Sequence, residues 1–117
     1  MWDASHGGYS STHYALQRGW EGSLAQADPE LVVIELGGND YVFQLTAAEF
    51  EANIRAIVAG VRASATGPVS IALLPIYNAE GRDPARYTPY VEAERRIAAE
   101  EGLAMIDLSA TDASLLT

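Results

Sequence analysis

The stretch Gly37-Gly38-Asn39-Asp40 combines the residue types in this sequence that are best suited to chemistry. Two glycines allow the backbone to turn sharply and to approach a bound ligand closely. The Asn39 amide can donate N–H bonds, and the Asp40 carboxylate can hold the loop by accepting backbone N–H bonds. Such a loop suits an anion or an oxygen that develops negative charge. The same residues are also typical of an ordinary turn that leads from a strand into a helix.

The elements that position this loop are short apolar runs separated by longer amphipathic segments. Residues 31–36 and 69–74 are nearly continuous apolar runs, which is typical of parallel strands covered on both faces. Residues 103–108 form a third and weaker run. Glu35 is the one charge in the first run, and we expect it to pair with an arginine, because burying an unpaired carboxylate is costly. The alternative is a position in water at an edge of the sheet.

Helices are predicted between the strands. Over residues 46–65 apolar side chains repeat with helical spacing, and Thr46 with Glu49 forms a capping box. The residues on that face are Phe50, Ile54, Ile57, Val58 and Val61. A second helix is predicted over residues 89–101, with Thr88 as N-cap and Gly102 as terminator.

A less regular helix is predicted over residues 12–26, where Gly19 and Gly22 weaken the pattern. The order strand, helix, strand, helix, strand is typical of a parallel α/β sheet with right-handed crossovers. Ligands of such sheets bind beyond the carboxyl ends of the strands. The loop that begins at Gly37 and the segment 77–82 should therefore meet at one edge, with Tyr77 and Asn78 as a pocket wall.

Residues 29–40 closely resemble the G-x-N-D block of SGNH/GDSL-type serine hydrolases. The resemblance implies a three-layer α/β/α, flavodoxin-like fold, of which residues 1–117 form a single, partial domain. It also implies that Asn39 donates its side-chain amide to an oxyanion hole, with Gly38 beside it as a substrate-binding residue.

Residues 3–10 resemble the second block of the same family. Gly8 falls on the glycine whose backbone N–H completes the oxyanion hole, and Gly7 is the alternative register. Asp3 replaces the asparagine that usually begins this block.

Neither the Gly-Asp-Ser-Leu-like block of the nucleophile nor the Asp-x-x-His block of the catalytic base is present in these 117 residues. The candidate substitutes for them are Ser5, Ser10, Ser11, His6 and His13, and none has the expected surroundings. No Gly-x-Ser-x-Gly elbow surrounds the serines, and histidines in a polar loop are expected at the surface. The two histidines are seven residues apart without an evident third ligand, so no metal site is predicted.

The resemblance therefore implies an ester or thioester hydrolase that acts on a small acyl substrate without a cofactor, and the isolated chain is expected to be inactive. The alternative is a non-catalytic α/β domain that binds a small ligand or a partner through the same loops. Reading the flanking gene sequence for the two absent blocks would separate these hypotheses.

Charge and hydropathy restrict the partners. Seven arginines against sixteen carboxylates give a formal charge of −9, which disfavours nucleic acid as a partner. No apolar run reaches the roughly 18 residues of a membrane span. The first residues lack the pattern of a signal peptide, and the compartment stays open. The carboxylates Glu92, Glu94, Glu100 and Glu101 are expected on a solvated helix face.

Self-association is expected as well. If the three strands are the third to fifth of a flavodoxin-like sheet, residues 31–36 form an apolar edge, with Glu35 as its only charge, on which a second chain could pair.

Overall fold

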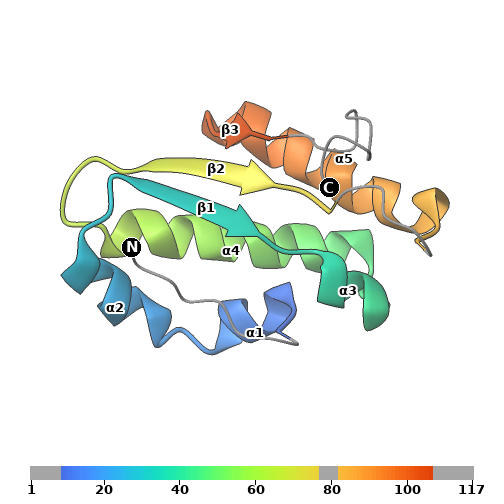
Figure 1. Ribbon diagram of the computed structural model, residues 1–117, viewed down its shortest axis with the longest axis horizontal. Coiled ribbons are helices and arrows are strands. Elements are labelled where there is room, and N and C mark those ends of the chain that lie inside the picture. Colours follow the sequence, from blue (N-terminus) through green and yellow to red (C-terminus); the bar gives the residue numbers. More distant parts are fainter. Residues whose placement is uncertain (1–8, 77–81, 107–117) are drawn as a thin grey trace, which may run out of the picture.

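A parallel sheet with helices packed against it makes up the computed structural model, which describes residues 9–76 and 82–106 (Figure 1). The strands are β1 (Leu31–Glu35), β2 (Ser70–Leu74) and β3 (Ala104–Met105). The helices are α1 (Ser11–Leu16), α2 (Trp20–Ala27), α3 (Gly38–Val42), α4 (Ala47–Ser64) and α5 (Pro84–Glu101). The α/β class that the sequence predicts is confirmed.

The strands lie in the order β1-β2-β3, and both pairs are parallel. Val33 is opposite Ala72, and Ala72 is in turn opposite Ala104. This is the neighbour order expected for the third to fifth strands of a flavodoxin-like sheet. Because all strands run the same way, the chain leaves each of them at the same edge of the sheet.

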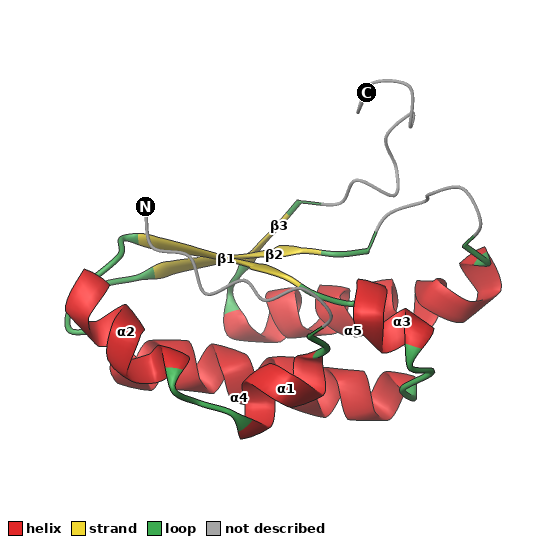
Figure 2. Ribbon diagram, turned by 60° about the horizontal axis from the view of Figure 1, so that its bottom comes forward, coloured by secondary structure: helices red, strands yellow, loops and turns green. Residues whose placement is uncertain are grey.

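All helices of the described residues lie on one side of the sheet (Figure 2). In β1, Val32 and Ile34 are buried against these helices, whereas Leu31 and Val33 are 58% and 48% exposed. The prediction that this strand is covered on both faces is therefore wrong for the structure described. Two successive right-handed crossovers in one direction along the sheet place α4 and α5 on the same face, which leaves the opposite face without a helix here.

Helix α4 supplies much of the core. Its predicted apolar face is confirmed, since Phe50, Ile54, Ile57, Val58 and Val61 are all buried. The Thr46 hydroxyl caps the helix by accepting the Glu49 backbone N–H at 3.1 Å. Burying an aliphatic or aromatic side chain of this size contributes roughly 1.5–3 kcal/mol, so this face anchors the helix to the sheet.

Helix α5 begins earlier than predicted. Its N-cap is Asp83, whose carboxylate accepts the Ala85 backbone N–H at 3.0 Å, and Pro84 occupies the first turn. Pro89 lies inside the helix, so the prediction of Thr88 as N-cap is wrong. The pair Asp83-Pro84 is itself a strong helix start, and the extra turns bury Tyr87 against the core.

The predicted helix over residues 12–26 is broken into α1 and α2. The Trp20 indole N–H donates to the Tyr14 carbonyl at 2.9 Å. A continuous helix would instead use that carbonyl to accept the backbone N–H of residue 18. Gly19 is the N-cap of α2. The third strand is shorter than predicted, and residues 107 and 108 lie outside the described range.

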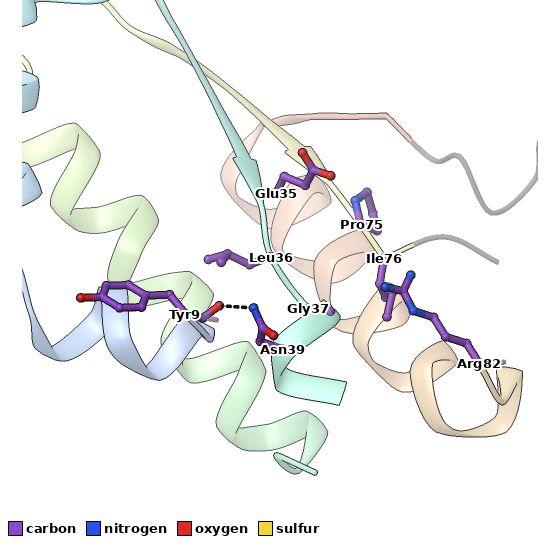
Figure 3. Close-up of a pocket in the computed structure, with 9 residues that line it drawn as sticks. Tyr9, Glu35, Leu36, Gly37, Asn39, Pro75, Ile76 and Arg82 are labelled. Atoms are coloured by element: carbon purple, nitrogen blue, oxygen red, sulfur yellow. Dashed lines mark hydrogen bonds between the residues drawn. The ribbon is translucent and has the colours of Figure 1, made fainter. Parts of the chain in front are cut away.

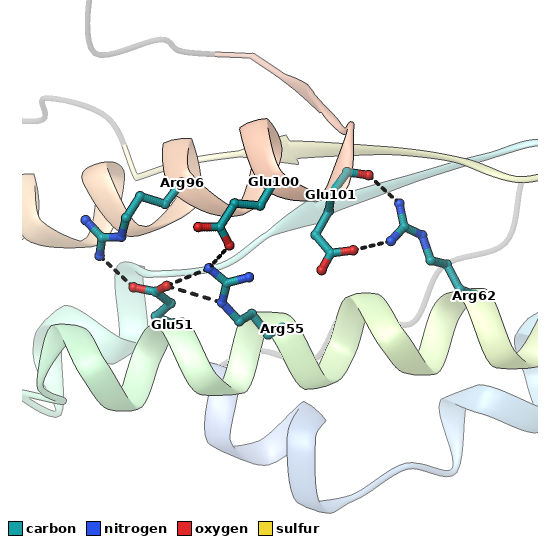
Figure 4. Close-up of polar contacts among 6 residues, drawn as sticks. All are labelled: Glu51, Arg55, Arg62, Arg96, Glu100 and Glu101. Atoms are coloured by element: carbon teal, nitrogen blue, oxygen red, sulfur yellow. Dashed lines mark hydrogen bonds and ion pairs between the residues drawn. The ribbon is translucent and has the colours of Figure 1, made fainter.

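Ion pairs join α4 to α5 at their exposed faces (Figure 4). Arg55 contacts Glu51 at 2.8 Å and Glu100 at 2.7 Å, and Arg96 reaches Glu51 at 2.6 Å. Hydrogen bonds from Arg96 and Arg55 lower the pKa of Glu51. Exposed pairs each contribute about 0–1 kcal/mol, so this network sets the register of the two helices more than it stabilises the fold.

Glu94 is the exception to the solvated face that was predicted for α5. Its residue is only 1% exposed, because it shares the core-facing side of the helix with Tyr90, Val91 and Ile97. The interpretation of Glu94 as a surface carboxylate is wrong.

Among the described helices, none is long and apolar enough to cross a bilayer.

Candidate functional site

The loop after β1 turns into α3 at Gly37. This residue has φ of +122°, a region that side chains with a Cβ rarely adopt, and a Cβ there would lie 3.4 Å from the Cβ of Ile76. The Gly37 carbonyl accepts the Tyr41 N–H at 2.8 Å and so begins the helix. The turn therefore places Asn39 in the first turn of α3, at the carboxyl end of β1.

The Asn39 side chain is held by a neighbouring segment. Its Nδ2 donates a hydrogen bond to the backbone carbonyl of Tyr9 at 3.0 Å (Figure 3). An amide nitrogen carries two hydrogens, and this bond uses one of them. The contact fixes the plane of the amide, which sets the direction of the second N–H.

Asp40 joins the same two segments from the inside. It is fully buried, its Oδ1 accepts the Ser11 backbone N–H at 2.9 Å, and its Oδ2 accepts the Ser11 hydroxyl. The Asn53 amide of α4 donates to Ser11 Oγ at 3.1 Å. The prediction that Asp40 accepts a backbone N–H is confirmed, although the N–H belongs to a distant part of the chain.

A pocket of about 200 Å³ opens where β1 and β2 end (Figure 3). It is lined by Tyr9, Glu35, Leu36, Gly37, Gly38, Asn39, Pro75, Ile76 and Arg82. Its position at the carboxyl ends of the parallel strands is the one expected for ligands of such sheets. The predicted substrate-contacting residue Gly38 and the predicted oxyanion donor Asn39 both line it.

The other predicted site residues cannot be placed in this pocket. Gly8 and its register alternative Gly7 lie outside the described residues, as do Tyr77 and Asn78. Arg82, at the end of the segment expected to form a pocket wall, does line the pocket. The structure thus brings together the part of the site that follows β1 and one residue of the wall that follows β2.

Two opposite charges border the pocket. Arg82 lies against the loop, since a Cβ added to Gly38 would be 3.3 Å from its Nη2. Glu35 lines the pocket from the exposed side of β1. None of the ion pairs among the described residues involves Glu35. The predicted pairing of this carboxylate with an arginine is therefore not observed among the described residues, and Glu35 takes the alternative, exposed position.

Ser10 and His13 contact each other, but their geometry is that of a helix cap. The Ser10 N–H donates to His13 Nδ1 at 2.9 Å, and Ser10 Oγ lies 3.1 Å from the same nitrogen. Ser10 and Ser11 are 2% and 0% exposed, so neither hydroxyl is accessible to a substrate. The Tyr9 and His13 rings stack with their centroids 4.6 Å apart. His13 is half-buried, whereas the sequence predicts a surface position.

Sequence reasoning missed Tyr9, which contributes only a backbone carbonyl, and the pairing of Ser11 with Asp40. No residue type or spacing signals either contact, because 29 residues separate Ser11 from Asp40. Within residues 9–76 and 82–106 no cluster of His, Cys, Asp and Glu could hold a metal ion.

Solved structures similar to this chain include hydrolases. The crystal structure of TesA is 28% identical with a TM-score of 0.71, and the match covers 87% of this chain and 54% of TesA. The psychrotrophic esterase EstA from Pseudoalteromonas sp., inhibited by monoethylphosphonate, is 24% identical with a TM-score of 0.73, covering 89% of this chain and 54% of EstA. A mutant of esterase AlinE4 is 19% identical with a TM-score of 0.71, and the match covers 94% of this chain and 58% of AlinE4. The latter two show the fold alone.

The chain therefore spans a little over half the length of these structures. No curated protein sequence gives a significant match. The profile of the GDSL-like Lipase/Acylhydrolase family matches residues 2–116, which is nearly the whole sequence. This match, together with the parallel sheet and the Asn39 loop at its carboxyl edge, shows that the chain belongs to the GDSL-like lipase/acylhydrolase family.

Proposed function

We propose that this chain supplies the oxyanion-stabilising part of a serine ester or thioester hydrolase. The observation that supports it best is the Asn39 amide, held at the pocket by the Tyr9 carbonyl. An oxyanion hole needs a hydrogen-bond donor that is oriented before negative charge develops on the substrate oxygen, and a fixed side-chain amide meets this requirement.

The chemistry follows from acyl transfer. When a serine hydroxyl attacks the carbonyl carbon of an ester, the carbonyl oxygen becomes negatively charged in the tetrahedral intermediate. The second N–H of Asn39 would donate to that oxygen, and the backbone N–H of Gly8 is the proposed second donor. Each such donor typically lowers the barrier by about 2.7–4 kcal/mol.

The proposed substrates are small acyl esters or thioesters, and no cofactor takes part in the reaction as proposed. Esterases are among the similar structures, and one of them was solved inhibited by a phosphonate. The pocket of about 200 Å³ fits a short acyl or alcohol group. Arg82 and Glu35 at its border provide contacts for polar groups of the substrate.

A chimera tests the proposal. Residues 2–116 of this chain replace the matching part of TesA, whose flanking parts would supply the serine and histidine blocks of the family. The chimera should hydrolyse p-nitrophenyl esters. Asn39→Ala should lower kcat by roughly 10²–10³ with KM nearly unchanged, because the donor acts mainly on the transition state.

Gln26→Ala is the matched control, since it removes an amide from the exposed surface of α2. It should leave kcat unchanged. An unchanged kcat in the Asn39→Ala chimera would show that Asn39 does not donate to the oxyanion. A folded chimera without any turnover would favour the non-catalytic, ligand-binding alternative.

We also propose that the chain self-associates through β1. The strand is at the edge of the described sheet, and its exposed side chains Leu31 and Val33 lie on the face without helices. Unpaired N–H and C=O groups on such an edge pair readily with another chain.

A further inference from the structure

Two adjacent hydrogen-bonded contacts tie the segment before and at the start of α1 to the segment after β1. The outer contact runs from the Asn39 amide to the Tyr9 carbonyl. The inner contact runs from the Ser11 backbone N–H and hydroxyl to the Asp40 carboxylate. The partners follow in the same order along the two segments, Tyr9 with Asn39 and Ser11 with Asp40, so each contact constrains the other.

We propose that Asp40 and Ser11 are positioning residues, which hold the Tyr9 carbonyl in place and through it orient the Asn39 amide. This inference rests on the proposed function only in assigning Asn39 to an oxyanion hole. Neither residue touches the substrate, because both are fully buried.

The inner contact is built to be rigid. Asp40 offers two carboxylate oxygens, and Ser11 presents two donors to them, so the pair cannot rotate about a single bond. Hydrogen bonds to an ionised acceptor are roughly twice as strong as neutral ones. Away from water, loss of either partner would leave a buried charge or donor unsatisfied.

The helices of the core brace this contact from two sides. From α4, the Asn53 amide donates to Ser11 Oγ at 3.1 Å and to Thr12 Oγ1 at 3.0 Å. From α5, the Tyr90 hydroxyl lies 3.1 Å from the Asp40 carbonyl. Contacts with the packed helices α4 and α5 therefore hold the Ser11–Asp40 pair, and through it the Tyr9 carbonyl, in place.

The outer contact needs that support. The terminal torsion of an asparagine side chain is broad, so the Asn39 amide would sample many orientations without a fixed acceptor. Catalytic donors must be held within about 0.5 Å and 10–20° of the productive geometry. Because Ser11 is two residues from Tyr9, fixing Ser11 restricts where the Tyr9 carbonyl can lie.

Nuclear magnetic resonance of the 117-residue chain tests the proposal without turnover. In the unmodified chain we expect a scalar coupling across the hydrogen bond from Asn39 Nδ2 to the Tyr9 carbonyl carbon, and unequal exchange rates for the two Nδ2 hydrogens. Ser11→Ala loses the hydroxyl bond to Asp40 and keeps the backbone bond, so it should weaken the coupling and bring the two rates closer together. Absence of the coupling from the unmodified chain, or an unchanged coupling in Ser11→Ala, would overturn the proposal.

Ser64→Ala is the matched control, because the Ser64 hydroxyl also donates to a carboxylate, that of Glu21. Ser64 is the last residue of α4, at the end of that helix remote from α3, to which Asn39 belongs (Figure 1). It should leave the coupling intact. Asp40→Asn should act like Ser11→Ala, since a neutral amide replaces the ionised carboxylate that accepts both Ser11 donors. If Asp40→Asn does not fold, the unmodified chain and Ser11→Ala still decide the outcome.

The same variants in the TesA chimera separate this proposal from the proposed function. Ser11→Ala should lower kcat about tenfold with little change in KM, and it should add little when Asn39 is already alanine. Additive effects would show that Ser11 does not act through Asn39. An Asn39→Ala chimera with unchanged kcat would instead contradict the oxyanion role and leave the resonance result standing.

Discussion

Glu94 is a buried carboxyl group close enough to the buried carboxylate of Asp40 for the two charges to repel. Neither oxygen of Glu94 has a hydrogen-bond partner among the described residues. Burial, and secondarily the charge of Asp40, raise the pKa of Glu94 to about 8. Glu94 is therefore mostly uncharged at neutral pH, and the protein carries a carboxyl group whose ionisation the fold opposes.

The first prediction concerns pH. An unfolded chain releases the Glu94 proton near pH 4.5, whereas the folded protein keeps it until about pH 8. Stability should therefore fall as the pH rises from about 4.5 to about 8 and change no further above that through this group. Glu94→Gln should remove this loss, with a gain at pH 8.5 on the order of a few kcal/mol.

Urea denaturation at several pH values measures this difference between the two proteins. Glu92→Gln is the control, since Glu92 is an exposed residue on the same helix that pairs with Arg95 at 2.8 Å. Its effect should stay below about 1 kcal/mol at every pH. A Glu94→Gln gain that does not grow with pH would contradict a buried, protonated carboxyl group.

The second prediction concerns the packing of α2 on α4. A Cβ on Gly60 would lie 2.9 Å from the Trp20 ring and would also collide with the Arg18 guanidinium. Gly60→Ala should destabilise the protein by about 1–3 kcal/mol, which exceeds the gain of up to about 1 kcal/mol in helix propensity.

Gly22 in α2 supplies the comparison, because a Cβ there meets nothing within 4 Å. Gly22→Ala should stabilise the protein by roughly 0.5–1 kcal/mol. Thermal unfolding of the two variants therefore shifts in opposite directions. Equal stabilisation by both substitutions would mean that α2 does not pack closely on α4.

The third prediction concerns self-association. Dimers or larger species should outnumber monomers at micromolar concentration, and moderate salt should favour them because it screens the repulsion between chains of charge −9. Val33→Lys should shift the population toward monomer, since lysine on an edge strand opposes pairing. Light scattering gives the mass in each case.

Leu16→Lys is the control, because Leu16 is 78% exposed and belongs to helix α1 rather than to a strand. It should leave the association unchanged. A monomer mass across the concentration range in the unmodified chain would show that the β1 edge is not available for pairing.

The fourth prediction concerns turnover. The 117-residue chain should not hydrolyse short nitrophenyl esters, because it contains no Gly-Asp-Ser-Leu-like block and the two candidate serines within the described residues, Ser10 and Ser11, are buried. A burst of nitrophenol that disappears after labelling with a serine-directed phosphonate would refute this prediction. The chain heated beyond unfolding serves as the background control.

The order of the elements and the place of the loop follow from local patterns in the sequence. Apolar runs of strand length and the 3.6-residue pattern of α4 are local signals, and parallel strands must end at one edge of the sheet. The position of Gly38 and Asn39 at the pocket follows from that rule. The start of α5 differs from the predicted one because two Pro-containing starts compete locally, and the Asp83 cap together with the burial of Tyr87 favours the earlier one.

The polar contacts, in contrast, depend on how the elements pack in the folded chain. Ser11 pairs with Asp40, and Asn39 with Tyr9, across about thirty residues of chain, because α1 packs on α4 beside the end of β1. Glu94 is buried because the core side of α5 is wider than its apolar residues alone indicate. Hydrogen bonding and burial at these positions depend on neighbours brought together by folding, and local sequence patterns do not specify those neighbours.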